Sequence, residues 1–299
     1  THHTMLFFTE KGRCYWLNVY QIPEGERTGK GRAIQNLLQI TPDDKVRAII
    51  DIKDLQDVDF VNSHYIILCT KKGIIKKTSL ADFSRPRQTG VNAITVVEGD
   101  ELLEARLTDG NCEVMMAVAS GRAIRFPESK VRPTGRGAIG VGGIEVDDER
   151  DEVVGMICVN PSTPDRTVLV LSEKGYGKRT VVDEYRITNR GGKGVKTISV
   201  TPKTGRLVGM VDVHQTEDLM ISCRSGVTIR MKVAQISEQG RATQGVRLIR
   251  IDEGDAIAAI TKIDVQDEEG TVAEVLETPA HAPTAPTLDT TEGTETASE

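Results

Sequence analysis

The sequence has few aromatic residues and no long apolar run. Its 299 residues include one Trp, five Tyr and five Phe, too few and too scattered for the aromatic platforms on which single-stranded nucleic acids stack. No stretch approaches eighteen apolar residues, so no segment has the pattern of a membrane-spanning helix. The N-terminus also lacks a signal-peptide pattern. These absences favour a cytoplasmic location.

Cysteine and histidine are sparse and have no metal-binding spacing. There are five cysteines and five histidines, and no two cysteines form a C-x-x-C pair. Most of the cysteines lie in apolar runs, which is typical of reduced, buried thiols in a cytoplasmic protein. No nucleophile, base and orienting group cluster in the sequence. We therefore expect no catalytic site, no metal and no cofactor in this segment.

Two glycines recur in step through five copies of one pattern. They are nineteen residues apart in four copies and seventeen in the second. The leading glycines are Gly12, Gly73, Gly121, Gly175 and Gly226, and the trailing glycines are Gly31, Gly90, Gly140, Gly194 and Gly245. Repeats of about fifty residues indicate stacked structural units that cannot bury their faces alone.

Each copy has the pattern of antiparallel strands. A short apolar run precedes the leading glycine, which suits a hairpin turn. A second strand signal follows the trailing glycine, and no long amphipathic helix appears before residue 264. The pattern predicts an all-β, propeller-like β-pinwheel with four-stranded blades. The expected repeats are residues 1–61, 62–110, 111–163, 164–215 and 216–263.

The C-terminal segment differs sharply in composition. Residues 264–299 carry ten of the 44 acidic residues and none of the 38 basic ones, so residues 1–263 have a net charge of +4. The segment has no aromatic residue and is rich in Thr, Ala, Pro and Glu. Such a composition cannot bury enough apolar surface to fold. We expect a mildly basic domain followed by a disordered acidic tail.

Basic residues recur at fixed positions of the repeat. Four residues after the leading glycine stand Lys77, Arg125, Arg179 and Arg230, and other cations precede the trailing glycine. Equivalent positions of stacked blades should form one exposed belt, which would suit the phosphates of duplex DNA. Pairing with nearby carboxylates is the alternative. The candidate DNA-binding residues are Arg27, Lys30, Lys76, Lys77, Arg85, Arg87, Arg125, Arg136, Lys178, Arg179, Arg190, Lys193, Arg230 and Arg241.

No element for reading base edges is apparent in the sequence. It shows no recognition helix and no zinc finger. Binding is therefore expected to be independent of sequence and to depend on backbone charge and DNA deformability.

The repeat resembles a known family. Its unit reads K-G-x-x-K-(K/R)-T, then an Arg-rich loop, then G-V-x-x-I-x-V, as at residues 72–78, 174–180 and 244–250. This pattern is similar to the C-terminal domains of DNA gyrase A subunits, in the type IIA topoisomerases. The resemblance implies a pinwheel, usually of six blades, that bends duplex DNA around a basic rim. It also implies two protein partners, the cleavage core of the same polypeptide and the ATPase B subunit, within a holoenzyme that needs ATP and magnesium.

One departure from the family pattern concerns its Q-R-R-G-G-K-G box. The nearest string is Arg190–Gly194, preceded by Asn189, and the first copy has only Arg27–Gly31. We expect this chain to be a fragment whose box lay upstream of Thr1, in which case the strand near Thr4–Phe8 would expose apolar surface. Two alternatives stay open: the C-terminal domain of a topoisomerase IV A subunit, which lacks the box, and a protein-interaction propeller.

Overall fold

The computed structural model describes residues 2–25, 31–252 and 254–263. The repeats form one compact unit, Thr1–Val265. Within the described ranges the unit is built almost entirely of β-strands, with one short α-helix, α1 (Val58–Ser63), and six 3-10 turns. No helix in those ranges is long and apolar enough to cross a membrane. The expected all-β architecture is confirmed.

Five antiparallel sheets follow one another along the chain, and we call them blades 1 to 5. Blade 1 has the order β3 (Val46–Ile52), β1 (Thr4–Thr9), β2 (Arg13–Asn18), β6 (Val91–Asn92). Blade 2 has the order β7 (Leu102–Thr108), β4 (Tyr65–Thr70), β5 (Ile74–Ser79), β10 (Val141–Gly142). Blade 3 has the order β11 (Val153–Val159), β8 (Glu113–Val118), β9 (Arg122–Pro127), β14 (Val195–Lys196).

The last two blades continue the pattern. Blade 4 has the order β15 (Leu207–His214), β12 (Arg166–Ser172), β13 (Tyr176–Val181), β18 (Val246–Arg247). Blade 5 has three strands among the described residues, in the order β19 (Ile257–Ile263), β16 (Asp218–Cys223), β17 (Thr228–Lys232). The 3-10 turns are η1 (Val19–Gln21), η2 (Ile34–Asn36), η3 (Leu80–Phe83), η4 (Glu128–Lys130), η5 (Val182–Glu184) and η6 (Val233–Gln235).

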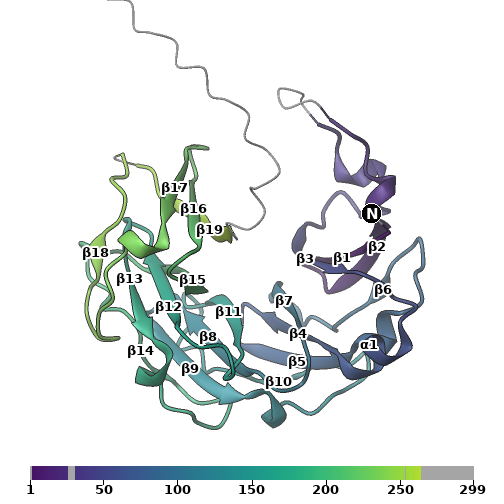
Figure 1. The fold of residues 1–299 in the computed structure, drawn as a ribbon, viewed down its shortest axis with the longest axis horizontal. Coiled ribbons are helices and arrows are strands. Elements are labelled where there is room, and N and C mark those ends of the chain that lie inside the picture. The colour runs from purple at the N-terminus through teal and green to yellow at the C-terminus, as the bar shows by residue number, and fades with distance from the viewer. Residues whose placement is uncertain (1, 26–30, 253, 264–299) are drawn as a thin grey trace, which may run out of the picture. The chain divides into compact units, whose positions relative to one another are not determined.

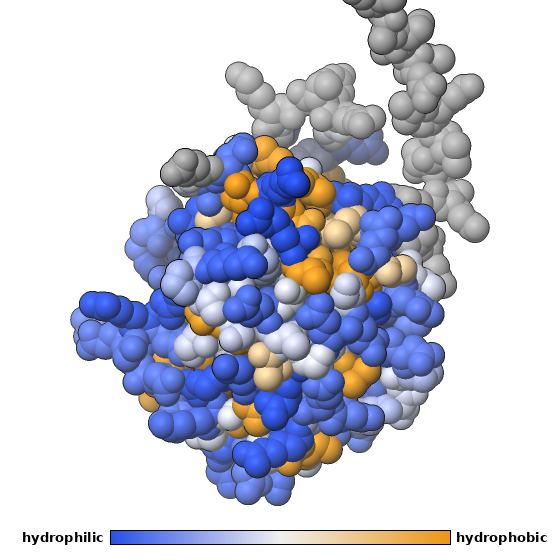
Figure 2. All heavy atoms as spheres, turned by 90° about the vertical axis from the view of Figure 1, so that its left-hand side faces the viewer, coloured by the Kyte–Doolittle hydropathy of each residue, from blue (hydrophilic) through white to orange (hydrophobic). Residues whose placement is uncertain are grey.

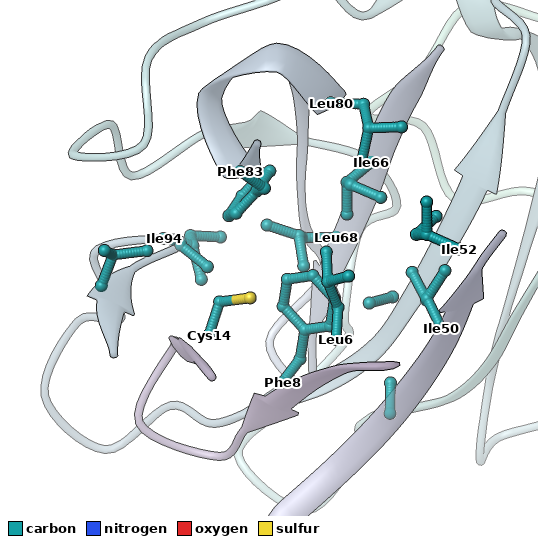
Figure 3. Packing of buried hydrophobic residues seen from close by; sticks show 14 of the residues in the cluster. Leu6, Phe8, Cys14, Ile50, Ile52, Ile66, Leu68, Leu80, Phe83 and Ile94 are labelled. Carbon is teal, nitrogen blue, oxygen red and sulfur yellow. The ribbon is translucent and has the colours of Figure 1, made fainter. Parts of the chain in front are cut away.

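The blades follow an arc (Figure 1). Strands β3, β7, β11, β15 and β19 lie toward its inside, and β6, β10, β14 and β18 lie on its outside. Apolar residues of neighbouring blades fill the space between them. Between blades 1 and 2, Leu6, Phe8 and Ile50 pack against Ile66 and Leu68 (Figure 3). Because both faces of a middle strand are buried, its sequence is a continuous apolar run rather than an alternating one.

The outer strand of each four-stranded blade comes from the next copy of the repeat. Strand β10, which follows the trailing Gly140 of the third copy, pairs with β5 of blade 2, and β14 of the fourth copy pairs with β9 of blade 3. The sequence pattern of a single copy does not reveal this exchange of the outer strand. A blade is therefore shared between two consecutive repeats, and the repeat boundaries are not blade boundaries.

This pairing of each outer strand with the blade of the preceding repeat, which we call strand exchange, explains why the two glycines recur. Gly121 has a φ of +88°, and a Cβ there would lie 2.7 Å from the carbonyl oxygen of Ile198, in the exchanged segment. The trailing Gly140 has a φ of +105°, and its Cβ would lie 2.6 Å from the carbonyl oxygen of Ile75. Each glycine thus allows a close backbone approach between neighbouring repeats.

The two ends of the series differ from the interior copies. A Cβ on Gly226 would meet nothing within 4 Å, and the described residues supply no outer strand to β17. The side chains of Val227 and Ile229 are accordingly exposed, and Figure 2 shows apolar residues among the polar ones on this side of the unit.

At the other end, the expectation of exposed apolar surface near Thr4–Phe8 was wrong. Leu6, Phe7 and Phe8 are all buried. Leu38 and Ile40, from the first copy's own connecting segment, pack in one cluster with Phe7. This segment therefore covers the face of blade 1 that blade 2 does not.

Candidate nucleic-acid interface

The four cations of the expected belt occupy equivalent strands but do not form an exposed rim. Lys77, Arg125, Arg179 and Arg230 lie on β5, β9, β13 and β17. Lys77 and Arg125 are buried, and Arg179 is half-buried. The expectation that the belt is exposed was therefore wrong for these three residues.

The buried members of the belt form ion pairs. Lys77 Nζ lies 2.7 Å from Glu128 Oε1 and 4.1 Å from the centre of the Tyr65 ring. Arg125 Nε donates to Glu113 Oε2 at 2.6 Å, and its Nη1 donates to the carbonyl oxygens of Val182 and Tyr185. A buried cation needs such partners because burial removes its hydration. These side chains hold neighbouring repeats together and are not available to DNA phosphates.

Arg230 is the exposed member of the belt. Its Nε lies 2.7 Å from Asp218 Oδ2, the residue that occupies the position of Glu113 in the fifth copy. The alternative of local charge pairing, which the sequence left open, is thus the one that the structure shows for Lys77, Arg125 and Arg230.

Lys76 and Lys178 are also buried, and the amine of each donates to a loop of the following repeat. Lys76 Nζ donates to the carbonyl oxygens of Ala93 at 2.6 Å and Arg136 at 2.8 Å. Lys178 Nζ donates to the carbonyl oxygen of Gly240 and to Thr243 Oγ1. Each amine therefore fixes the loop of the following copy against its own blade. The proposal that they contact DNA directly is not consistent with this burial.

The buried amines of Lys76 and Lys178 are expected to make the free energy of unfolding vary with pH in the alkaline range. Desolvation lowers the pKa of each from 10.5 to about 8. Between these two values the unfolded chain binds more protons than the folded chain, so the free energy of unfolding rises as the pH increases from 8 to 10.5. The same contribution is lost as the pH falls back through 8. The free energy of unfolding of the wild type, relative to Lys76→Met/Lys178→Met, should increase over this range. Urea denaturation at several pH values measures it, and a constant difference would contradict the assignment.

The exchanged parts of the repeats combine exposed positive charge with few carboxylates. We define the outer segments as residues 84–97, 129–144, 185–200 and 237–251, which run from the end of each hairpin through the outer strand. Together they contain twelve Lys or Arg residues and one carboxylate, Glu238. They include β6, β10, β14 and β18, which lie along the outside of the arc (Figure 1).

Six of the predicted residues lie in the outer segments. Arg85, Arg87 and Lys193 are exposed, and Arg136, Arg190 and Arg241 are half-buried. Arg190 donates to the carbonyl oxygens of Lys130 and Gly142, so it bridges to the preceding outer segment. Arg241 donates likewise to the carbonyl oxygen of Lys196. The predicted residues Arg27 and Lys30 lie outside the described residues.

Sequence reasoning missed half of the cations in the outer segments. All of them are exposed: Lys130, Arg132, Arg186, Lys196, Arg247 and Arg250. Counting positions from the leading glycine concealed them, because the exchanged strand belongs to another blade. For two of them, Lys196 and Arg247, the available signal was a cation two residues after the trailing glycine.

Within the described part of the chain no group of His, Cys, Asp or Glu residues is arranged to hold a metal ion. Cys14, Cys69, Cys112 and Cys223 are buried and Cys158 is half-buried, all as free thiols. Burial raises the pKa of Cys14 and Cys69 well above its ordinary value. Their roles are in packing.

The fold and the rim define a class of protein: a strand-exchanged, propeller-like domain with a basic outer edge. The family model described as "DNA gyrase C-terminal domain, beta-propeller" matches residues 3–53, 64–109, 113–160, 166–214 and 217–264. The chain therefore belongs to the DNA gyrase A C-terminal domain family.

Relatives with high sequence identity agree with the family assignment. The chain is 42% identical over 280 residues to the DNA gyrase A subunit of Staphylococcus aureus strain MRSA252, covering 92% of this chain and 31% of that protein. It is 43% identical over 270 residues to the corresponding protein of strain NCTC 8325, covering 90% of this chain and 30% of that protein. The chain thus spans about a third of the length of these relatives.

Solved structures share the fold. The C-terminal domain of DNA topoisomerase IV has a TM-score of 0.78 at 23% identity, covering 89% of this chain and 80% of that one. The C-terminal domain of DNA gyrase A has a TM-score of 0.74 at 25% identity, covering 88% of this chain and 83% of that one. The fold is therefore common to both kinds of type IIA topoisomerase domain.

Proposed function

We propose that this domain binds duplex DNA along its outer segments, independently of base sequence, and bends it. The observation that carries the proposal is the charge of those segments, twelve cations against one carboxylate on the outside of the arc. Closely spaced phosphates attract such a surface through Coulomb interaction and counterion release. A duplex that contacts successive blades of an arc must curve with it, at an elastic cost that the added phosphate contacts offset.

The wider role follows from the family. We infer that the domain is part of a DNA gyrase A polypeptide, lies in the cytoplasm beside the cleavage core of that polypeptide and the ATPase B subunit, and supports supercoiling. The chemistry that requires ATP and magnesium would then reside in those partners. The structural likeness to topoisomerase IV keeps that assignment as the second candidate, whereas the identity of 42–43% to gyrase A relatives favours the first.

Charge reversal in one outer segment is expected to weaken DNA binding. Lys193 and Lys196 are exposed, and Lys193 lies 3.8 Å from its nearest carboxylate partner, Glu145. Lys193→Glu/Lys196→Glu should lower affinity for a duplex of about 40 base pairs at least tenfold at low salt, and should reduce the slope of log affinity against log salt by about two. Fluorescence anisotropy across a salt series measures both quantities.

The matched control carries the same charge change away from the outer segments. Lys53 and Lys72 are exposed and lie outside them, so Lys53→Glu/Lys72→Glu should bind nearly as the wild type does. Equal losses for the two variants would refute a localised DNA path. Affinity should also grow with duplex length over several blades, whereas a protein-interaction propeller would show no such growth.

A further inference from the structure

A cavity between the third and fourth repeats has a polar lining that DNA binding along the outer segments does not use. It has a volume of about 590 Å³ and is lined by parts of β9, β12, β13 and η5 and by the loop 160–165. Three arginines, Arg125, Arg166 and Arg179, contribute to the lining. The carboxylates of Asp165, Asp183 and Glu238 also line it, and all three residues are exposed.

Two of the three guanidinium groups are neutralised within the fold. Arg125 is paired with Glu113, and Arg166 lies 3.2 Å from Glu217 and 2.6 Å from Asp212. Arg166 nevertheless leaves its Nε buried without a hydrogen-bond partner. Arg179 uses only its Nε, which donates to the carbonyl oxygen of Ile236 at 2.9 Å. Its Nη1 and Nη2 find no partner among the described residues.

Comparison of the copies shows why Arg179 lacks the ion-pair partner that Arg125 and Arg230 have. The partner of Arg125 is Glu113 and that of Arg230 is Asp218, each eight residues before its leading glycine. The same position of the fourth copy is Thr167. The partner of Lys77 is Glu128, seven residues after the next leading glycine, and the equivalent for Arg179 is Val233. Both positions that supply a carboxylate elsewhere are uncharged here.

We propose that this cavity binds the phosphate group of a small molecule, held by the two free Nη groups of Arg179. The planar guanidinium presents two parallel N–H donors, which match the spacing of two phosphate oxygens. Arg179 lies on β13 and not in an outer segment, and one of the carboxylates in the lining, that of Asp183, lies 3.7 Å from Arg125 Nη1. The site is therefore distinct from the outer segments, and it does not depend on their binding DNA.

Thr167→Glu is the sharpest test, because it builds the counter-charge that the third and fifth copies possess. Thr167 stands in the same register to Arg179 as Glu113 does to Arg125: Leu169 faces Arg179, and Met115 faces Arg125. The new carboxylate should pair with Arg179 and lower the affinity for inorganic pyrophosphate at least tenfold without lowering the melting temperature. Isothermal titration calorimetry of the full chain measures the affinity. Unchanged pyrophosphate binding by a folded variant would overturn the proposal.

Two further measurements complete the design. Arg179→Met should reduce pyrophosphate affinity as much as Thr167→Glu does, whereas Arg186→Met, which removes an exposed arginine of the neighbouring outer segment, should leave it unchanged. Equal losses at both arginines would indicate diffuse surface attraction and overturn the assignment. Saturation with a duplex should leave pyrophosphate affinity unchanged, and displacement by the duplex would assign the site to the DNA backbone instead. Absence of measurable binding by the wild type would also overturn the proposal.

Discussion

Glu128→Gln is expected to destabilise the protein by about 3–5 kcal/mol. The carboxylate is almost completely buried, with 1% of its side chain exposed, beside the similarly buried amine of Lys77. It also accepts hydrogen bonds from Thr108 Oγ1 and from the backbone of Cys112. Glutamine keeps the size and an acceptor but removes the charge, so Lys77 is left as an uncompensated buried cation. Urea denaturation followed by circular dichroism measures the loss.

Two control variants separate the effect of losing a charge from the effect of its burial. Asp218→Asn removes the equivalent counter-charge of blade 5, where 39% of the Arg230 side chain is exposed, and should cost less than about 1 kcal/mol. Lys77→Met/Glu128→Leu removes both charges of the buried pair and should recover much of the loss. If Glu128→Gln cost no more than Asp218→Asn, burial would not be the source of the effect.

Gly121→Ala is expected to cost about 3 kcal/mol or more, and Gly226→Ala about 1–2 kcal/mol. Both glycines have a φ near +90°, so alanine is strained by about 1–2 kcal/mol at either position. Only at Gly121 would the new Cβ also lie 2.7 Å from the carbonyl oxygen of Ile198 and 2.8 Å from Val200 Cγ2. The additional cost arises because the exchanged segment must move away from blade 3.

The difference in stability loss between Gly121→Ala and Gly226→Ala measures how much the close packing of the exchanged segment contributes to stability. Thermal unfolding of both variants gives the stability difference, and duplex affinity gives a second measure, because Lys193 and Lys196 lie on the segment that Gly121→Ala displaces. Gly121→Ala should therefore weaken DNA binding while Gly226→Ala leaves it nearly unchanged. Equal stability of the two variants would mean that the exchanged strand contributes little to the blade.

Part of this architecture could be predicted from the sequence, and part could not. The apolar runs and the recurring glycines predicted the hairpins at Gly12, Gly73, Gly121 and Gly175, because local conformation follows from local sequence. The exchange of the outer strand could not be predicted, since a two-residue pairing such as β10 with β5 leaves no periodic signal. A repeat pattern also looks the same whether a strand joins its own blade or the preceding one.

The exposure of the belt was wrongly predicted for a related reason. The register of Lys77 and Arg125 within the repeat was correct, yet a fixed register does not distinguish an exposed cation from one buried against Glu128 or Glu113. The carboxylates stand on other strands or in the next copy, so their proximity is a property of the tertiary structure. Loop cations such as Arg85 and Lys193 are exposed, as expected, because no neighbouring element covers them.

Each interior repeat donates one strand to the repeat before it and accepts one from the repeat after it. A repeat inserted by tandem duplication therefore brings both an edge that needs a strand and a strand that fits such an edge. The number of blades can change through gain or loss of whole repeats without any new interface having to arise. A deletion that ends within a repeat, by contrast, leaves the preceding blade without its outer edge. Exchange of the outer strand thus makes the complete repeat, and not the blade, the smallest unit by which such a domain can lengthen or shorten.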